Sequence, residues 1–280
     1  MNNNKLIKIS SITKKLLVAL LGAFLMVFVL FHACANLFIL AKDGGDAYSA
    51  FCHFMGTNVI IKIFEIVLLG AFLFHIIITV WLWFLNRQSR PVRYHERSRT
   101  RTAKGSKLAI ITGSLLLVCV LFHFYDFYFV KHGFVKGEYM VKTVDLASAN
   151  PQQQMSDESM MVLMNAANEE GKLSKDGQWL RKLSAEEVDA LKKDFPADIF
   201  EPDFYNMARQ KFSVWHIVLC YIVFFFLVGL HLRHGFESAF QTFGLNSRKY
   251  SKLIEVIGII YCWVVCLIFT IVPVFVFLGF

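Results

Sequence analysis

The sequence predicts an all-α polytopic membrane protein with five transmembrane helices. The chain of 280 residues is 56% hydrophobic and contains 29 phenylalanines. Its mean hydropathy of +0.51 is far too apolar for a soluble domain of this length. Apolar stretches long enough to cross a bilayer occur five times, and none shows the alternation typical of a strand. Because lipid offers no partner to unpaired backbone amides, each stretch is expected to be a helix.

Five segments have the length of a membrane span. A helix needs about 20 apolar residues to cross the hydrocarbon core, because each residue advances it by about 1.5 Å. The predicted spans, numbered I to V, are 16–41, 60–85, 108–130, 212–232 and 253–278. The first run is too long for a cleavable signal peptide and has no small-residue cleavage site behind it. Span I is therefore expected to remain in the mature protein.

Lysine and arginine collect on one side of the predicted spans. The connection from Arg87 to Lys107 contains eight basic residues and one acid, Glu96, and the N-terminal segment and the connection between spans IV and V are also basic. Cytoplasmic loops are enriched in Lys and Arg. We therefore expect a multi-pass protein of the bacterial cytoplasmic membrane, with its N-terminus in the cytoplasm and its C-terminus outside. Basic runs also occur in nucleic-acid-binding proteins, but beside membrane spans no nucleic-acid partner is expected.

One hydrophilic segment, 131–211, contains 14 acidic and 11 basic residues and is expected outside the membrane. A capping box from Ser184 to Glu187 predicts a short helix over "SAEEVDALKKDF". The stretch "SDESMMVLMNAANEEG" predicts another helix that stops at Gly171. We expect an external cap packed over the mouth of the bundle, without a catalytic role. The sequence thus divides into three segments: 1–130, 131–211 and 212–280.

Four of the five spans carry a histidine inside the apolar run: His32, His75, His123 and His231. A polar ring is costly in lipid and is expected to face the bundle interior, either in a hydrogen bond between helices or in a functional site. Counted at about 1.5 Å per residue, His32 and His123 lie at one level, roughly 25 Å from the cytoplasmic side. His75 and His231 share a second level, nearer the cytoplasm.

Two pairs of facing imidazoles in a four-helix core are what two bis-histidine haems require, because histidine is a common metal ligand and bundles build cofactor sites from facing helices. The predicted pairs are His32 with His123 and His75 with His231. None of the six cysteines belongs to a C-x-x-C-H attachment motif. The sequence therefore predicts two haem b groups, with the cysteines as packing residues.

Further residues are candidates for haem contacts. Gly22 and Gly113 each precede a histidine by ten residues, which places them near the level of the inner pair. A small residue there would let a macrocycle approach the backbone, and helix packing is the alternative. Arg233 and His234 follow His231 and are candidates for binding haem propionates, because Arg can pair with a carboxylate through two hydrogen bonds. Anchoring at the membrane interface is their alternative role.

Three polar residues near the predicted outer side are candidates for a quinone site. Glu65 lies in the outer half of span II, and an intramembrane carboxylate can accept a proton from a quinol. His53, in the outer loop, and His216, at the start of span IV, could line the same site. The spacing of 15 residues from His216 to His231 is found in cytochromes that stack two ligands on each of two helices. No second helix repeats this spacing, so His216 is not expected to be a ligand.

The order and spacing of these motifs resemble the cytochrome b subunit of the succinate dehydrogenase and fumarate reductase family, in the class with five spans, one membrane chain and two haems. The motifs are "VLFHACANLF" in span I, "HFM" before span II with Glu65 early in that span, "TG" ten residues before the span III histidine, and "HLRHGFESAFQTFG" in span IV. The resemblance covers nearly the whole chain apart from part of 131–211.

The resemblance implies the membrane subunit of an enzyme whose succinate or fumarate chemistry occurs on a partner. His75 and His231 would hold the inner haem, near an iron–sulfur subunit, and menaquinone would react near the outer haem, around Glu65 and His53. The cytoplasmic partners would be that subunit, with its iron–sulfur clusters, and a flavoprotein with FAD. Two such heterotrimers could associate.

Two alternatives stay open at this point. One is the dihaem cytochrome b subunit of another quinone-linked complex, of the hydrogenase or formate dehydrogenase type. The other, from a different functional class, is a proton-coupled transporter that uses its histidines as a relay.

Overall fold

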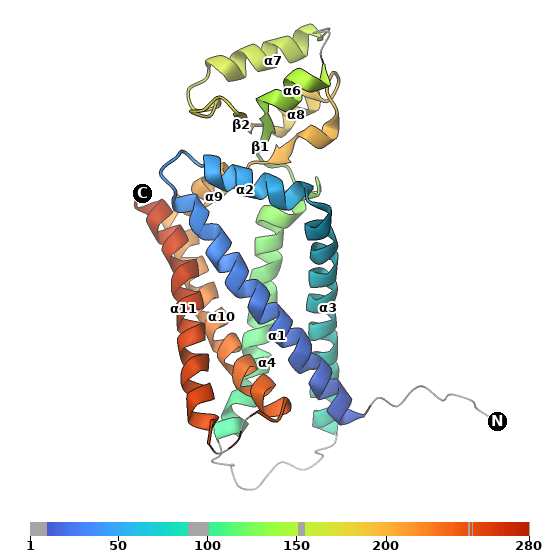
Figure 1. Cartoon of the computed structure of the whole chain (residues 1–280), viewed down its shortest axis with the longest axis vertical. Coiled ribbons are helices and arrows are strands. Elements are labelled where there is room, and N and C mark those ends of the chain that lie inside the picture. The colour runs from blue at the N-terminus through green and yellow to red at the C-terminus, as the bar shows by residue number, and fades with distance from the viewer. Residues whose placement is uncertain (1–9, 89–100, 151–154, 246, 248, 280) are drawn as a thin grey trace, which may run out of the picture. The chain divides into compact units, whose positions relative to one another are not determined.

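The computed structural model describes residues 10–88, 101–150, 155–245, 247 and 249–279 (Figure 1). Within them, five helices are long and apolar enough to cross a membrane. These spans are Ile12–Leu40, Val59–Gln88, Leu108–Lys131, Trp215–Thr242 and Ser251–Phe277. The predicted all-α polytopic fold is therefore confirmed. The main difference concerns span IV, whose helix begins after the predicted residue 212 and continues beyond 232.

The bundle consists of α1 (Ser11–Asn36), α3 (Val59–Gln88), α4 (Arg101–His123), α10 (Trp215–Thr242) and α11 (Ser251–Phe277). Shorter helices adjoin these spans: η1 (Leu37–Leu40), α2 (Asp46–Thr57), the π-helix η2 (Phe124–Tyr128), α5 (Phe129–Lys131) and α9 (Phe204–Phe212). The hydrophilic segment adds β1 (Tyr139–Lys142), α6 (Thr143–Ala149), α7 (Asp157–Asn168), β2 (Trp179–Leu183), α8 (Ala185–Leu191), η3 (Ala197–Ile199) and β3 (Glu201–Pro202).

The chain folds into two compact units. Unit 1 comprises the described residues of 1–35, 59–116 and 223–269. Unit 2 comprises those of 36–58, 117–222 and 270–280. Both units differ from the three segments expected from the sequence, because several long helices contribute residues to each unit.

Unit 1 is a helical bundle with a core between α1, α10 and α11 (Figure 1). Leu232, Cys262 and Val265 are buried there, and Met26 and Tyr261 pack against them. The Tyr261 hydroxyl donates a hydrogen bond to the Met26 carbonyl at 2.6 Å. Many large apolar side chains stay exposed on the outer helix faces. Such surfaces suit lipid, whose tails are as apolar as the side chains themselves.

Helices α10 and α11 approach closely at Gly229. A Cβ atom on this glycine would lie 2.5 Å from the Cys266 Sγ atom. The Cys266 thiol donates a hydrogen bond at 3.1 Å to the carbonyl of Phe225, which lies one turn before Gly229 on α10. A glycine in a membrane helix commonly permits such backbone contact. The packing of these two helices thus gives Gly229 a structural role.

One end of unit 1 carries cation–aromatic contacts. The Lys14 Nζ atom lies 3.9 Å from the Trp81 ring centroid, and the Arg87 Cζ atom lies 5.4 Å from that of Trp83. Tryptophan and basic side chains are enriched at membrane interfaces. The basic connection that follows α3 was the main argument for the predicted orientation, and its residues 89–100 lie outside the described residues. The orientation therefore stays a prediction.

The hydrophilic segment contains a three-stranded antiparallel sheet in the order β2-β1-β3, which the sequence did not predict. The pairing of β1 with β2 shifts in register between Tyr139 and Val141. Lys182, on β2, has a φ of 55° beside this irregularity. An extra residue in one strand of such a pair bends the strand locally. The strands have two to five residues, too few for an alternating pattern to stand out.

Both predicted helices of the hydrophilic segment are present. In α8 the capping box is complete: the Glu187 amide donates to Ser184 Oγ, and the Ser184 amide donates to a Glu187 carboxylate oxygen. Helix α7 starts with the Ser156 side chain as its N-cap. It ends at Asn168, earlier than predicted, and Gly171 follows in a left-handed conformation with φ of 82°.

Unit 2 contains two hydrophobic clusters. The cluster within the sheet domain includes Val141, Leu180, Leu183, Val188, Leu191 and Phe200. The other joins η1, α2 and α9 to the first turns of α10 and the last turns of α11, and includes Ile39, Tyr48, Tyr205, Phe212, Val218 and Val272. The hydrophilic segment thus packs on the helix ends that belong to its own unit, and its position outside the membrane stays a prediction.

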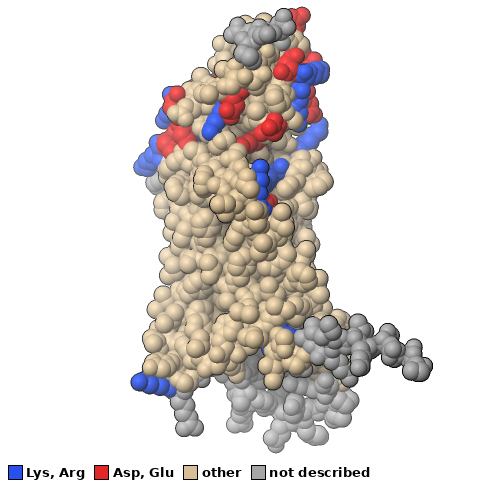
Figure 2. Space-filling view, turned by 45° about the vertical axis from the view of Figure 1, so that its right-hand side comes forward, with Lys and Arg blue, Asp and Glu red and all other residues tan. Residues whose placement is uncertain are grey.

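Buried polar contacts hold the sheet domain against the loop before α2. The Arg181 guanidinium, only 4% exposed, donates to the Gly44 carbonyl at 2.7 Å and to the Asp46 carboxylate at 2.5 Å. The fully buried Asp203 accepts from the Asn206 amide at the start of α9. Figure 2 shows charged side chains gathered on the hydrophilic segment, whereas the long helices present mostly uncharged surface.

Replacing Gly229 by alanine should loosen the contact between α10 and α11. Overpacking of this kind costs about 1–3 kcal/mol, and we expect the free energy of unfolding in detergent to fall by this amount in a denaturant titration. The double variant Gly229→Ala/Cys266→Ala should recover most of the loss, because the colliding sulfur is gone. Equal losses in the single and double variants would contradict this account.

Candidate functional site

Two predicted ligands, His75 on α3 and His231 on α10, face each other inside unit 1. Their ring centroids are 6.5 Å apart and their planes make an angle of 81°. The His231 Nδ1 atom lies 3.3 Å from the Thr112 hydroxyl. The His75 Nδ1 atom is buried and has no hydrogen-bond partner among the described residues. The structure thus brings together the pair that the sequence assigned to the inner level.

Glycines lie against both imidazoles. A Cβ atom on Gly22 would be 3.5 Å from the His75 Cε1 atom, and one on Gly113 would be 3.2 Å from the His231 Cε1 atom. The structure thus places Gly22 beside His75 and Gly113 beside His231, and their role at a haem stays a prediction. Any larger residue at Gly113 would press on the His231 ring.

The donor set of this pair fits a haem. The two imidazoles face each other with ring centroids 6.5 Å apart, so both could ligate one metal ion. Among the described residues, no group of three or more His, Cys, Asp or Glu side chains could hold a metal ion. An ion at this pair would need further ligands besides these described side chains. A porphyrin supplies four and leaves two axial positions for histidine.

The other two predicted ligands lie in different units. His32, in unit 1, has its ring stacked on Phe28 with centroids 5.5 Å apart, and lies 5.8 Å from the Phe269 centroid. His123, in unit 2, is the last residue of α4, and its ring centroid lies 5.2 Å from that of Phe127. Both rings are surrounded by aromatic side chains. Their pairing with each other stays a prediction.

Arg233 and His234 lie on α10, which continues past the predicted end of span IV. Both side chains are half-buried. The Arg233 Nε atom lies 3.4 Å from a Glu237 carboxylate oxygen one turn later. This contact is long and partly exposed, and it involves only the Nε atom of the Arg233 guanidinium. Binding of haem propionates by these two residues stays a prediction.

The predicted quinone residues are spread over both units. Glu65 is half-buried on α3 in unit 1. His53, on α2 in unit 2, has its Nδ1 atom 2.9 Å from a Glu201 carboxylate oxygen, and its ring lies edge-on to Trp179. His53 is thus engaged with the sheet domain. His216 is exposed at the start of α10, and the prediction that it is not a ligand stays a prediction.

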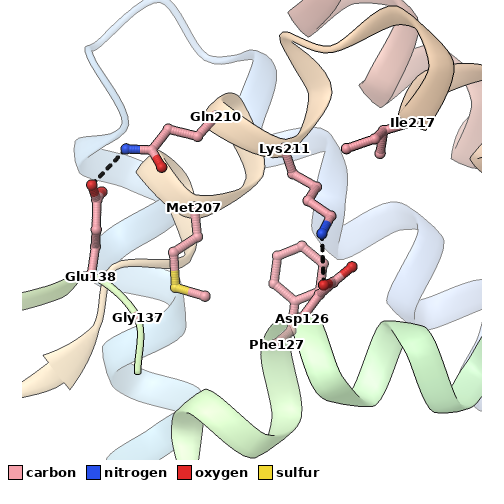
Figure 3. A pocket seen from close by; sticks show the side chains of 8 residues that line it. All are labelled: Asp126, Phe127, Gly137, Glu138, Met207, Gln210, Lys211 and Ile217. Atoms are coloured by element: carbon pink, nitrogen blue, oxygen red, sulfur yellow. Dashed lines mark hydrogen bonds and ion pairs between the residues drawn. The ribbon is translucent and has the colours of Figure 1, made fainter. Parts of the chain in front are cut away.

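A polar cluster beside His123 was missed by sequence reasoning. The Lys211 ammonium, at the end of α9, donates to the Asp126 carboxylate at 2.7 Å (Figure 3). Asp126 lies on the π-helix η2, directly after α4. The sequence did give one signal for this cluster, because Asp126 stands in an apolar run three residues after the predicted ligand His123. Its partner Lys211, however, is 85 residues away in the sequence.

Comparison of the chain with protein-family models, with curated proteins and with solved structures found no match.

Alanine variants at the four histidines should reveal two ligand pairs. His75→Ala and His231→Ala are each expected to remove the same haem from the visible spectrum of the purified protein, because each abolishes one axial bond of one site. His32→Ala and His123→Ala should remove the other haem. If His32→Ala and His75→Ala abolished the same haem and spared the second, the pairing would be wrong.

Proposed function

We propose that this chain is the membrane anchor and electron-transfer subunit of a succinate:quinone oxidoreductase, a succinate dehydrogenase or fumarate reductase. It would pass electrons between a cytoplasmic iron–sulfur subunit and menaquinone through two b-type haems. The observation that supports this most strongly is the His75–His231 pair, with ring centroids 6.5 Å apart inside a bundle of apolar helices.

The residues around this pair would bind and orient the inner haem. His75 and His231 would hold the haem, and the bound haem would supply one-electron oxidation and reduction. The Thr112 hydroxyl lies at the Nδ1 atom of His231 and would fix which ring nitrogen faces the metal. Gly22 and Gly113 keep the neighbouring backbones close to the rings.

The remaining assignments follow the resemblance. His32 and His123 would hold the outer haem, and Arg233 and His234 would bind propionates of the inner one. Menaquinone would react near the outer haem, with Glu65 and His53 as its contacts. Succinate or fumarate chemistry would occur on the flavoprotein partner.

The membrane arrangement is part of the proposal. The basic connection after α3 would lie in the cytoplasm, where the iron–sulfur subunit docks, and the hydrophilic segment 131–211 would lie outside. This arrangement agrees with the cation–aromatic contacts of Lys14 and Arg87 at one end of unit 1. It places the inner histidine pair nearer to the soluble partners.

The deciding experiment is purification of the complex from its membrane. A reduced-minus-oxidised spectrum and haem extraction should give two noncovalent b-type haems per chain. Absence of haem would overturn the proposal and favour the transporter alternative. Co-purification of a hydrogenase or formate dehydrogenase subunit, in place of a flavoprotein and an iron–sulfur subunit, would establish the other alternative. The variant His216→Ala, at an exposed position, should keep both haems.

The glycine beside His231 provides a second prediction. In Gly113→Ala the new Cβ would lie 3.2 Å from the His231 ring, which must then shift. Displacing the His231 ligand in this way is expected to weaken binding of the inner haem by about tenfold. Mutation of residues that orient a metal ligand weakens metal binding by a similar factor. The matched control is Gly70→Ala on α3, where the added Cβ meets nothing within 4 Å. Equal haem occupancy in both variants, measured optically during haem titration, would contradict the prediction.

A further inference from the structure

Helix α7 carries a cluster of exposed methionines on its outward face. The helix packs on α8 and β2 within unit 2 (Figure 1). Its inward stripe has the spacing i, i+3, i+4, i+7 and consists of Ser159, Val162, Leu163 and Ala166. Ser159 and Ala166 are fully buried, and the other two pack against the hydrophobic cluster of the sheet domain. This stripe fixes the inward face of an amphipathic helix.

Met160, Met161 and Met164 lie on the opposite face of α7. Their side chains are 44%, 62% and 60% exposed. At about 100° per residue they span roughly 100° of the helix circumference, opposite the buried stripe. An outward helix face normally carries charged and polar residues. The chain has nine methionines and four of them fall within 155–164, so composition alone does not account for the cluster.

The sulfur atoms of these three methionines can converge on one point. Met160 and Met164 are four residues apart, and Met161 and Met164 are three apart. Residues at these spacings are neighbours on a helix, with Cβ atoms about 5–6 Å apart. Each methionine side chain is unbranched and turns about three bonds. Because all three are exposed, they have room to direct their sulfur atoms toward a common ligand above Met164.

Thioether sulfur restricts such a ligand to a soft metal ion. Thioethers select Cu(I), whereas Ca²⁺ and Mg²⁺ take oxygen ligands and zinc takes thiolate, imidazole or carboxylate. The cluster offers one carboxylate, that of Asp157, which is exposed four residues before Met161. One acid is too few for a hard divalent ion, but its negative charge raises the local concentration of a monovalent cation. Neutral sulfur ligands suit an ion with a single positive charge.

Apolar contact with another protein is the main alternative, because methionine-rich surfaces also bind varied partners. The other exposed residues of α7 are Asp157, Glu158, Asn165, Ala167 and Asn168. The exposed part of this helix thus contains no aromatic residue and no arginine, which are the usual anchors of a protein interface. What its large apolar side chains share is sulfur. This favours a metal ligand over an apolar partner.

We infer that Met160, Met161 and Met164 form a binding site for Cu(I). The three thioether sulfurs are its ligands, and the Asp157 carboxylate attracts the ion to the helix. The site shares no residue with the histidine pairs, so it does not depend on the proposed function. A thioether does not titrate in the range where histidine does, so binding of the metal is independent of pH between about 5 and 8.

The test is NMR of the purified complex in lipid nanodiscs, with the methionine methyl groups labelled with ¹³C. The cysteine thiols are first blocked with N-ethylmaleimide, because they also bind soft metals. Ag(I), which shares the ligand preference of Cu(I) and is not oxidised by air, is titrated first, and Cu(I) follows under ascorbate without oxygen. The methyl resonances of Met160, Met161 and Met164 should shift together and saturate at one ion per chain. The affinity should be the same at pH values of about 5 and 7.

Leucine substitutions, which nearly conserve side-chain volume, test the three ligands. Met164→Leu removes the methionine that neighbours both others. Loss of a residue that only orients a metal ligand costs about 10–100-fold in affinity, so loss of a ligand should weaken Ag(I) binding by at least about tenfold. Met160→Leu and Met161→Leu should each weaken it as well. The matched control is Met155→Leu, because Met155 packs against the sheet-domain cluster and its replacement should leave Ag(I) binding unchanged.

Equal Ag(I) affinity in Met164→Leu and Met155→Leu would overturn the site. If the three resonances ignored Ag(I) and shifted only when the partner subunits were removed, the methionine cluster would be a protein contact and not a metal site. Shifts with Ag(I) but none with Cu(I) would overturn the assignment to copper. Haem content measured in the same sample tests the proposed function separately, because the methionine site requires no haem.

Discussion

The central constraint on this fold is the cost of placing an imidazole among lipid-facing helices. Water cannot satisfy the ring nitrogens there, and an unsatisfied polar group costs several kcal/mol. His231 lies against the Thr112 hydroxyl, whereas the Nδ1 atom of His75 has no partner among the described residues. Glycines border both rings. Contacts between helices thus satisfy part of the polar groups of the pair, and the haem proposed above would satisfy the rest.

The same constraint explains why the two levels of histidine differ in their surroundings. At the inner level the rings meet glycine backbone and each other. At the outer level His32 and His123 pack against phenylalanine rings. Beside His123 the helix changes to a π-turn, and an acid enters the apolar wall. The four histidines thus have chemically different surroundings.

The hydrophilic segment holds helix α9 in place, which its composition does not predict. The Asp203 carboxylate joins the Lys182 amide on β2 to the start of α9. Tyr205 and Phe212 on α9 are buried against the helix ends of unit 2. These contacts hold α9 so that the Lys211 ammonium reaches Asp126 on η2. A segment expected to be a passive cap therefore positions the side chain that pairs with Asp126.

The sequence by itself determined the five helices, the shared level of His75 and His231, and the level of Gly22 and Gly113, because helix length and rise are local properties that lipid enforces. It also determined α8, whose capping box spans only three residues. The tertiary structure decided the rest. The short strands and the Lys211–Asp126 pair depend on contacts between residues far apart in the chain. No local pattern encodes such contacts, because their free energy arises only when the elements meet.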